Sequence, residues 1–286
     1  LPVDLNSYLF KYEKDIAALA RILGQEEEAV DWEERAHKRR ELVTSYCWDE
    51  ETGLFYDYDF VNRERRPIRS LATFTPLYTG LATGEQAKRV RENLPLFERD
   101  YGLATCAQVY SEKQWDGDNG WPNLNAEAIG GLLHYGYFED ASRLREKWLG
   151  MVLKVFNQTG RLWEKYNVAK GNIEVQGRYK MPEMAGWTAG TWVVLNNMVI
   201  SDRNLKNYGR WYNWAEPGFD WSSFKESPVS PNKNLKLYIG GAGDSSEAYR
   251  RHPSRMVKVW EGMGYAPEAV SYTHLRAHET SLHLVC

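Results

Sequence analysis

Two aromatic and polar segments contain the residues with the clearest chemical use. The segment QWDGDNGWP, from Gln114 to Pro122, combines the indoles of Trp115 and Trp121 with the carboxylate of Asp116. Glycine, aspartate and asparagine are poor helix and strand formers, so this segment is predicted to be a loop. One interpretation is a tight turn between helices, with Trp121 buried and Asp116 capping a helix. The other is a sugar subsite, where an indole stacks on a pyranose ring while Gln114 and Asp116 hydrogen-bond to hydroxyl groups.

A glutamate among aromatic side chains lies further along the chain. Glu164 stands between Trp163 and Tyr166 in the segment GRLWEKYNVAKGNIEVQ. A glutamate beside a lysine is most simply a surface residue. Held on a loop and partly desolvated by aromatic rings, it is instead suited to take a proton from water as a general base. In a third segment, MAGWTAGTWVVL, Trp187 either anchors the packing of a helix or closes a sugar pocket.

Composition narrows the classes of protein to which these segments could belong. The chain has 286 residues, a formal net charge of −3 and a pI near 6.1, which favour neither nucleic acid nor an anionic membrane as a partner. No apolar run is long enough to predict a membrane span. Three cysteines at unrelated spacings predict neither a disulfide framework nor a zinc site. Aromatic residues make up 14% of the chain, and their flat rings are suited to gripping sugars.

Hydrophobic periodicity predicts that helices carry these loops. Apolar residues recur every three to four positions in two long opening segments, and Gly24 ends the first of them. The sequence has no sustained alternation typical of strands, so the predicted fold class is all-α, with functional loops gathered on one face. The expected helices cover residues 4–23, 26–46, 73–82, 84–98, 124–136, 139–158 and 186–197.

The last third of the chain differs in character. Residues 199–270 are polar and show no clear helical face, so they are expected to form an uncertain tail outside the domain at 1–198. Residues 271–286, SYTHLRAHETSLHLVC, look like read-through of a sequencing-library adaptor and are expected to be non-native. The histidines of that stretch therefore do not support a metal site, although the spacing of His274 and His278 invites one.

Several segments together resemble the glycoside hydrolase family of α,α-trehalases. QWDGDNGWP is similar to the family's tryptophan signature, and WEKYNV to its Glu-Lys-Tyr-Asp/Asn segment. GNIEVQ and the following GWTAG resemble its glycine-rich stretch, while VDLNSYLF and CWDEETGLFYDYDF resemble its Asp-Leu-Asn helix and Asp-Tyr-Asp segment. The segments occur in the family's order and cover roughly residues 1–198, which is more specific than any single motif.

The resemblance implies an (α/α)6 barrel that hydrolyses trehalose, a disaccharide, with inversion. One carboxylic acid protonates the bridging oxygen while a second carboxylate activates water on the opposite face of the sugar, so neither a metal nor an organic cofactor is expected. By position, Glu164 matches the family's general base. The substrate-binding positions that the resemblance implies are Gln114, Asp116, Trp121, Asn172, Glu174 and Trp187.

One functional position of the family has no counterpart in this chain, and another has two candidates. The family's general acid is an aspartate in a Gly-Trp-Asp segment shortly before the Asp-Leu-Asn helix, and no aspartate of the 286 residues has that context. We therefore expect an N-terminally truncated fragment with an incomplete barrel that is inactive alone. The family's substrate-binding glutamate falls on Asn172, with Glu174 as the alternative, and a few extra residues follow within GRYKMPEMA. Two further possibilities are another α-glucoside hydrolase on the same barrel and a non-catalytic sugar-binding relative.

Overall fold

The computed structural model describes residues 1–183 and 185–198. The expectations for the tail at 199–270 and the adaptor-like end at 271–286 lie outside these residues. Most of the regular structure in the described part is helical, as the sequence predicts. The α-helices are α1 (Val3–Ile22), α2 (Glu26–Cys47), α3 (Thr75–Tyr78), α4 (Gly84–Glu92), α5 (Pro122–His134), α6 (Phe138–Thr159) and α7 (Ala185–Asn197).

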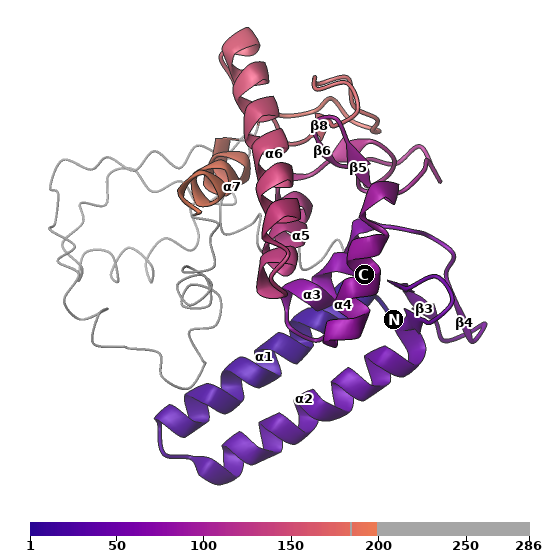
Figure 1. Cartoon of the computed structure of the whole chain (residues 1–286), viewed down its shortest axis with the longest axis vertical. Helices are drawn as coiled ribbons and strands as arrows, with labels where there is room; N and C mark the ends of the chain where they lie inside the picture. Colours follow the sequence, from indigo (N-terminus) through magenta and orange to yellow (C-terminus); the bar gives the residue numbers. More distant parts are fainter. Residues whose placement is uncertain (184, 199–286) are drawn as a thin grey trace, which may run out of the picture.

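The first two helices form a long hairpin (Figure 1). Residues seven apart share one face of a helix, and here the shared positions are buried and mostly small or apolar. The turn between the helices uses Gly24 at a φ of +74°, a value that favours glycine. Across the seam, Arg39 pairs with Glu13 at 2.7 Å. The buried positions with this spacing are Val3, Phe10 and Ala17 on α1, and Ala29, Ala36 and Val43 on α2.

The later helices extend this hairpin in succession. α1 packs against α3, α3 against α5 and α5 against α7, while α6 packs against both α5 and α7 (Figure 1). Gly131 permits the close approach of α5 to α3, because a Cβ there would lie 2.9 Å from the backbone nitrogen of Tyr78. Fully buried residues at the centre of this packing are Phe74, Leu77, Phe97, Ile129, Leu132 and Trp148.

Antiparallel pairs of two-residue strands shape the loops between the helices. Three of them join neighbouring segments, whereas β7 and β8 pair the two loops for which the sequence predicts chemistry. In that pair Asn119 faces Asn167 and Gly120 faces Tyr166. The pairs are β1 (Trp48–Asp49) with β2 (Leu54–Phe55), β3 (Tyr58–Asp59) with β4 (Glu64–Arg65), β5 (Glu98–Arg99) with β6 (Gly102–Leu103), and β7 (Asn119–Gly120) with β8 (Tyr166–Asn167).

Two helices are shorter than their periodicity predicts. The helix expected over 73–82 is a 3-10 turn, η1 (Leu71–Phe74), followed by the single turn of α3, and Gly80 follows with a φ of +73°. The helix expected over 84–98 ends at Glu92, where the 3-10 turn η2 (Leu94–Leu96) begins soon after. Pro95 lacks the N–H that an α-helix needs there. The other helices agree with the expected bounds to within two residues.

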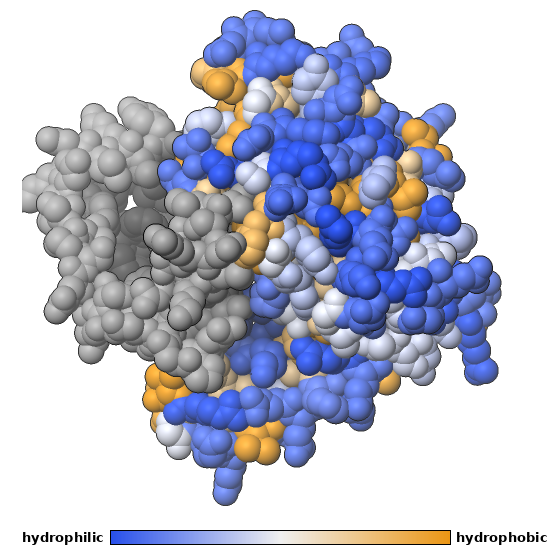
Figure 2. Space-filling view, viewed as in Figure 1, coloured by the Kyte–Doolittle hydropathy of each residue, from blue (hydrophilic) through white to orange (hydrophobic). Residues whose placement is uncertain are grey.

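The visible face of the described part is mostly hydrophilic, with apolar side chains in small groups (Figure 2). No helix in this part of the chain is long and apolar enough to cross a bilayer. Among the same residues, no three histidine, cysteine, aspartate or glutamate side chains gather where they could hold a metal ion.

Candidate functional site

Asp116 organises the first loop from within. Only 2% of the residue is exposed, and its carboxylate accepts hydrogen bonds from the backbone N–H groups of Tyr110 at 2.9 Å, Gly117 at 2.7 Å and Ser111. Burial acts to raise the pKa of Asp116, but a hydrogen bond from the Ser111 side chain, followed by these backbone hydrogen bonds, holds it below its ordinary value. Asp116 therefore caps no helix, and its proposed contact with a sugar stays a prediction.

Trp121 is covered by a second indole. Trp115 stacks on it with ring centroids 3.6 Å apart and planes 5° apart, and Trp187 meets its edge at 5.6 Å. Trp121 is 2% exposed, whereas Trp115 is 40% exposed. The Nε1 of Trp121 also donates to the carbonyl of Gln114 at 3.1 Å. Trp115, which is not among the substrate-binding positions predicted from the sequence, is thus the more exposed indole of this stack.

Asn119 joins the first loop to the second. Its side-chain amide donates to the carbonyls of Gln114 at 2.8 Å and Gln176 at 2.7 Å, and its Oδ1 accepts the backbone N–H of Gln176 at 3.0 Å. The Nε2 of Gln176 in turn donates to the carbonyls of Ser111 at 2.6 Å and Lys113 at 2.9 Å. These bonds and the β7–β8 pair fix the two loops against each other. Gln114 takes part in this network through its backbone carbonyl, which accepts hydrogen bonds from Asn119 and Trp121.

Glu164 lies on the second loop with its side chain 14% exposed. Its Oε2 accepts hydrogen bonds from the ammonium of Lys165 at 2.7 Å and from the hydroxyl of Tyr179. The Nε1 of Trp187, at the start of α7, donates to the backbone carbonyl of Glu164 at 3.1 Å. Trp187 therefore does more than pack a helix, because it ties α7 to the segment that carries this carboxylate.

Lys165 is a charged group that sequence reasoning missed. It is 1% exposed, and its ammonium lies 4.9 Å from the ring centroid of Trp121 and 4.3 Å from that of Tyr179. It also donates to the Tyr179 hydroxyl at 2.9 Å. A buried ammonium is tolerated only with such partners. Burial, followed by the hydrogen bond to Glu164, raises the pKa of Tyr179, so this phenol stays a neutral donor.

The two alternatives for a substrate-binding glutamate lie at the rim of the second loop. Glu174 is exposed and pairs with Lys170 at 2.9 Å, and the hydrogen bond from Lys170 lowers the pKa of Glu174. The Oδ1 of Asn172 accepts the backbone N–H of Glu174 at 3.0 Å. Neither side chain hydrogen-bonds to Glu164, so both roles stay predictions.

The structure brings Glu164 together with Trp121 and Trp187, around the ammonium of Lys165. Such a site offers a carboxylate of fixed orientation beside indole rings, the combination expected for activating water next to a sugar.

Solved structures similar to this chain include a neutral trehalase and a mannosylglycerate hydrolase. Neutral trehalase Nth1 from Saccharomyces cerevisiae matches with a TM-score of 0.60 and 33% identity, over 74% of this chain and 40% of that chain. The GH63 mannosylglycerate hydrolase from Thermus thermophilus matches with a TM-score of 0.55 over 68% of this chain and 44% of that chain. At 22% identity, the second match is a likeness of fold alone. The fold is thus that of a helical glycoside hydrolase.

The family itself follows from sequence. The family model for trehalase matches residues 1–199, so the chain belongs to the trehalase family of glycoside hydrolases. Cytosolic neutral trehalase from Kluyveromyces lactis is 38% identical over 188 residues, which is 59% of this chain and 25% of that protein. The chain thus spans a quarter of the length of this relative. The resemblance inferred from the motifs is confirmed.

Proposed function

We propose that the protein to which this chain belongs hydrolyses α,α-trehalose to two glucose molecules with inversion, and that Glu164 is its general base. The proposal rests on one observation above all. The residue that matches the trehalase base is a largely buried carboxylate whose Oε2 is engaged by Lys165 and Tyr179. A surface glutamate without a role would have no need of a buried cation.

The proposed step uses the two carboxylate oxygens of Glu164 differently. Lys165 and Tyr179 hold Oε2, which fixes the direction of Oε1. Oε1 takes a proton from water as that water attacks the anomeric carbon. A separate carboxylic acid, roughly 6.5–9.5 Å away, protonates the bridging oxygen as the glycosidic bond breaks. We place this acid on a segment N-terminal to α1, and two carboxylates with one water make a cofactor unnecessary.

The proposed sugar contacts come mainly from the indoles. Trp187 borders Glu164, and the stack of Trp115 on Trp121 supplies both a buried wall and an exposed ring. An exposed indole face is suited to the apolar face of a pyranose. The remaining polar contacts that we propose are Gln114, Asp116, Asn172 and Glu174.

We also propose that these helices are part of an (α/α)6 barrel. The supporting observation is the succession of packed helices α1, α3, α5 and α7, with α2 and α6 each returning along the outside of its predecessor. A crystal structure of the chimera described below tests this, because a barrel needs further helix pairs between α7 and α1. An open row of helices there would contradict it.

Two alternatives rest on particular residues. Asn172 stands where the family carries a glutamate, and Glu174 is exposed, which favours an α-glucoside hydrolase of different specificity. A full-length parent without a Gly-Trp-Asp aspartate before Leu1 would favour the second alternative, a sugar-binding relative that does not cut.

The test is a chimera in which residues 1–198 replace the matching part of the Kluyveromyces lactis neutral trehalase. We expect the chimera to release glucose from trehalose, with α- and β-glucose equal in the first NMR spectra, because inversion changes only one of the two anomeric carbons. The 286-residue chain alone is the control and should release none. Faster cleavage of maltose would support the first alternative, and trehalose binding without cleavage the second.

A further inference from the structure

A cavity of about 420 Å³ lies apart from Glu164, where three segments meet. One wall is the β1–β2 turn with Asp49 and Thr52, and a second is the strand end and loop at 65–69. The third wall includes Tyr110, whose backbone N–H donates to Asp116 at 2.9 Å, so the sugar-site loop also borders this cavity. Its volume falls in the range of pockets that take small ligands, roughly 300–1,000 Å³.

The cavity carries more positive than negative charge. Arg65, Arg66 and Arg69 line it, and Asp49 is the one carboxylate among its lining residues. Thr52 donates to Asp49 through its backbone N–H at 2.8 Å and its hydroxyl at 3.0 Å. The backbone hydrogen bond from Thr52 is the main cause that lowers the pKa of Asp49, so this carboxylate stays charged, yet the three guanidinium groups still outnumber the carboxylates that line the cavity.

The three arginines of the cavity have N–H groups that no close carboxylate engages. Arg65 lies 3.6 Å from Asp49, and Arg66 lies 3.9 Å from Asp59. Both separations exceed the 2.7–2.9 Å, roughly, of a charge-assisted hydrogen bond. Within the described part of the chain, the guanidinium of Arg69 has neither a hydrogen bond nor an ion pair. By contrast, Arg99 elsewhere in the fold binds its aspartate at 2.8 Å.

A tyrosine hydroxyl adds a polar group to the same cavity. Tyr56 is 6% exposed, yet its hydroxyl makes no hydrogen bond to a described residue, although Tyr56 lines the cavity. This hydroxyl is therefore free to donate or accept a hydrogen bond with a ligand in the cavity.

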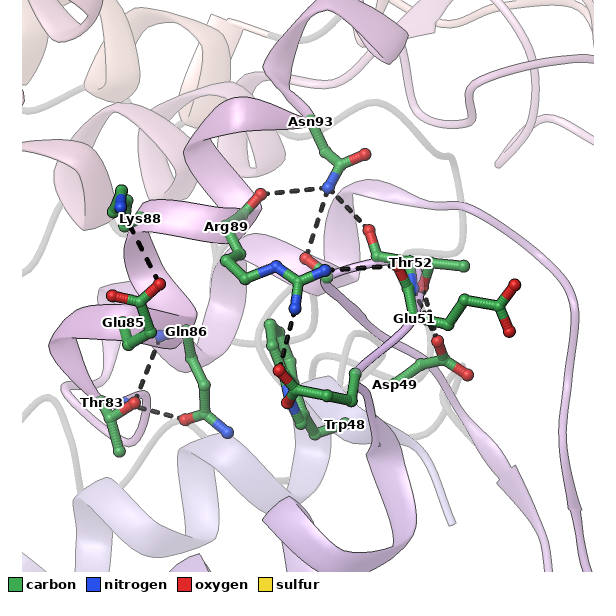
Figure 3. A network of polar contacts seen from close by, with 12 residues as sticks. Trp48, Asp49, Glu51, Thr52, Thr83, Glu85, Gln86, Lys88, Arg89 and Asn93 are labelled. Atoms are coloured by element: carbon green, nitrogen blue, oxygen red, sulfur yellow. Dashed lines mark hydrogen bonds and ion pairs between the residues drawn. The ribbon is translucent and has the colours of Figure 1, made fainter.

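Hydrogen bonds from α4 and from the residue that follows it fix the β1–β2 turn, which carries Asp49 and Thr52 (Figure 3). Arg89 of α4 donates to the carboxylate of Glu50 at 2.9 Å and to the carbonyl of Glu51 at 3.2 Å. Asn93 donates to the carbonyl of Thr52 at 2.9 Å. The cavity therefore keeps its shape without a ligand, which lowers the entropic cost of binding one.

We propose that this cavity binds the phosphate group of a small phosphorylated molecule, through Arg66 and Arg69. Guanidinium groups match phosphate oxygens with paired N–H donors, which favours phosphate over a spherical anion. The cavity is larger than a phosphate ion, so a hexose-sized body also fits beside Tyr56 and Gln108. This inference does not depend on the role of Glu164.

The test is calorimetric titration of the 286-residue chain with glucose 6-phosphate, inorganic phosphate and glucose. We expect saturable binding of glucose 6-phosphate, none of glucose, and affinity that falls as salt rises. Tighter binding of the sugar phosphate than of inorganic phosphate would identify a phosphorylated sugar as the ligand, and equal binding would identify free phosphate. Either result supports the phosphate site.

Two arginine variants test whether phosphate binds in this cavity. Arg69→Gln should weaken it at least tenfold while leaving the melting temperature unchanged, because this guanidinium stabilises nothing in the described part of the fold. Arg35→Gln on α2 is the matched control, since Arg35 is exposed, pairs with Asp31 and lies over the ring of Trp32 on the same helix, and does not line the cavity. No binding of either phosphate, or equal weakening by both variants, would overturn the proposal.

Discussion

Replacing Lys165 with methionine removes a cation that the fold keeps almost wholly from water. The methionine fills most of the same space but donates no hydrogen bond. Lys165→Met therefore deletes the 2.7 Å ion pair with Glu164, the 2.9 Å hydrogen bond to Tyr179 and a cation–π contact with each of Trp121 and Tyr179. The carboxylate of Glu164 is left without its counter-charge.

The size of the effect follows from these contacts. Breaking a buried ion pair by removing one partner costs about 3–5 kcal/mol. Glu164 is 14% exposed and keeps the Tyr179 hydroxyl as a donor, which favours the lower end, about 3 kcal/mol. For a domain of this size such a loss lowers the melting temperature by roughly 6–12 °C.

The assay is urea unfolding of the 286-residue chain at pH 7, followed by tryptophan fluorescence. Lys170→Met is the matched control, because Lys170 makes an exposed pair with Glu174 whose loss costs about 0–1 kcal/mol. In the Glu164→Gln background, Lys165→Met should cost less, since no unpaired charge is left behind. If Lys165→Met destabilises the chain no more than Lys170→Met, the buried pair is not what holds this site.

Two further predictions concern stability. Burial raises the pKa of Glu127 from 4.5 to about 7, so the folded chain keeps a proton that the unfolded chain loses, and stability should fall as pH rises from 4.5 to 7. The free energy of unfolding should fall by about 3 kcal/mol over this range. In urea titrations at pH 5 and pH 8, Glu127→Gln should abolish the difference between the two free energies. If the variant keeps the same difference, the carboxyl of Glu127 is not buried as described. At Gly120 a Cβ would lie 2.2 Å from Val168, so Gly120→Ala should cost about 1–3 kcal/mol in thermal melts. Gly150→Ala, in open space on α6, should instead stabilise by about 0.5–1 kcal/mol, and similar melting temperatures for the two variants would refute this packing argument.

The sequence predicts the helices well where their apolar faces are long. α1, α2, α5 and α6 each bury a periodic face, and that periodicity is visible in the residues themselves. α3 and α4 are shorter than predicted because local turn geometry interrupts the pattern near Gly80 and Pro95. The trehalase resemblance is likewise confirmed, because several ordered motifs carry it.

The arrangement of the site is harder to predict. Lys165 escapes sequence reasoning because lysine is almost never fully buried, and only the aromatic side chains around WEKY hinted at partners. The two-residue strands β7 and β8 are too short for any alternation, so their pairing is invisible beforehand. Tyr179 lies in GRYKMPEMA, outside the motifs that carry the resemblance, so the resemblance gives no reason to expect its hydrogen bond to Glu164.

The most direct test of the general-base assignment is the turnover number of the chimera carrying Glu164→Gln. The amide keeps the shape of the side chain but cannot take a proton from water, so kcat for trehalose should fall by roughly 10²–10⁴ while KM changes little. Glu112→Gln, which changes an exposed carboxylate on the first loop, should leave kcat unchanged. A Glu164→Gln chimera that keeps most of its kcat would show that Glu164 only supports the fold and that another group activates the water.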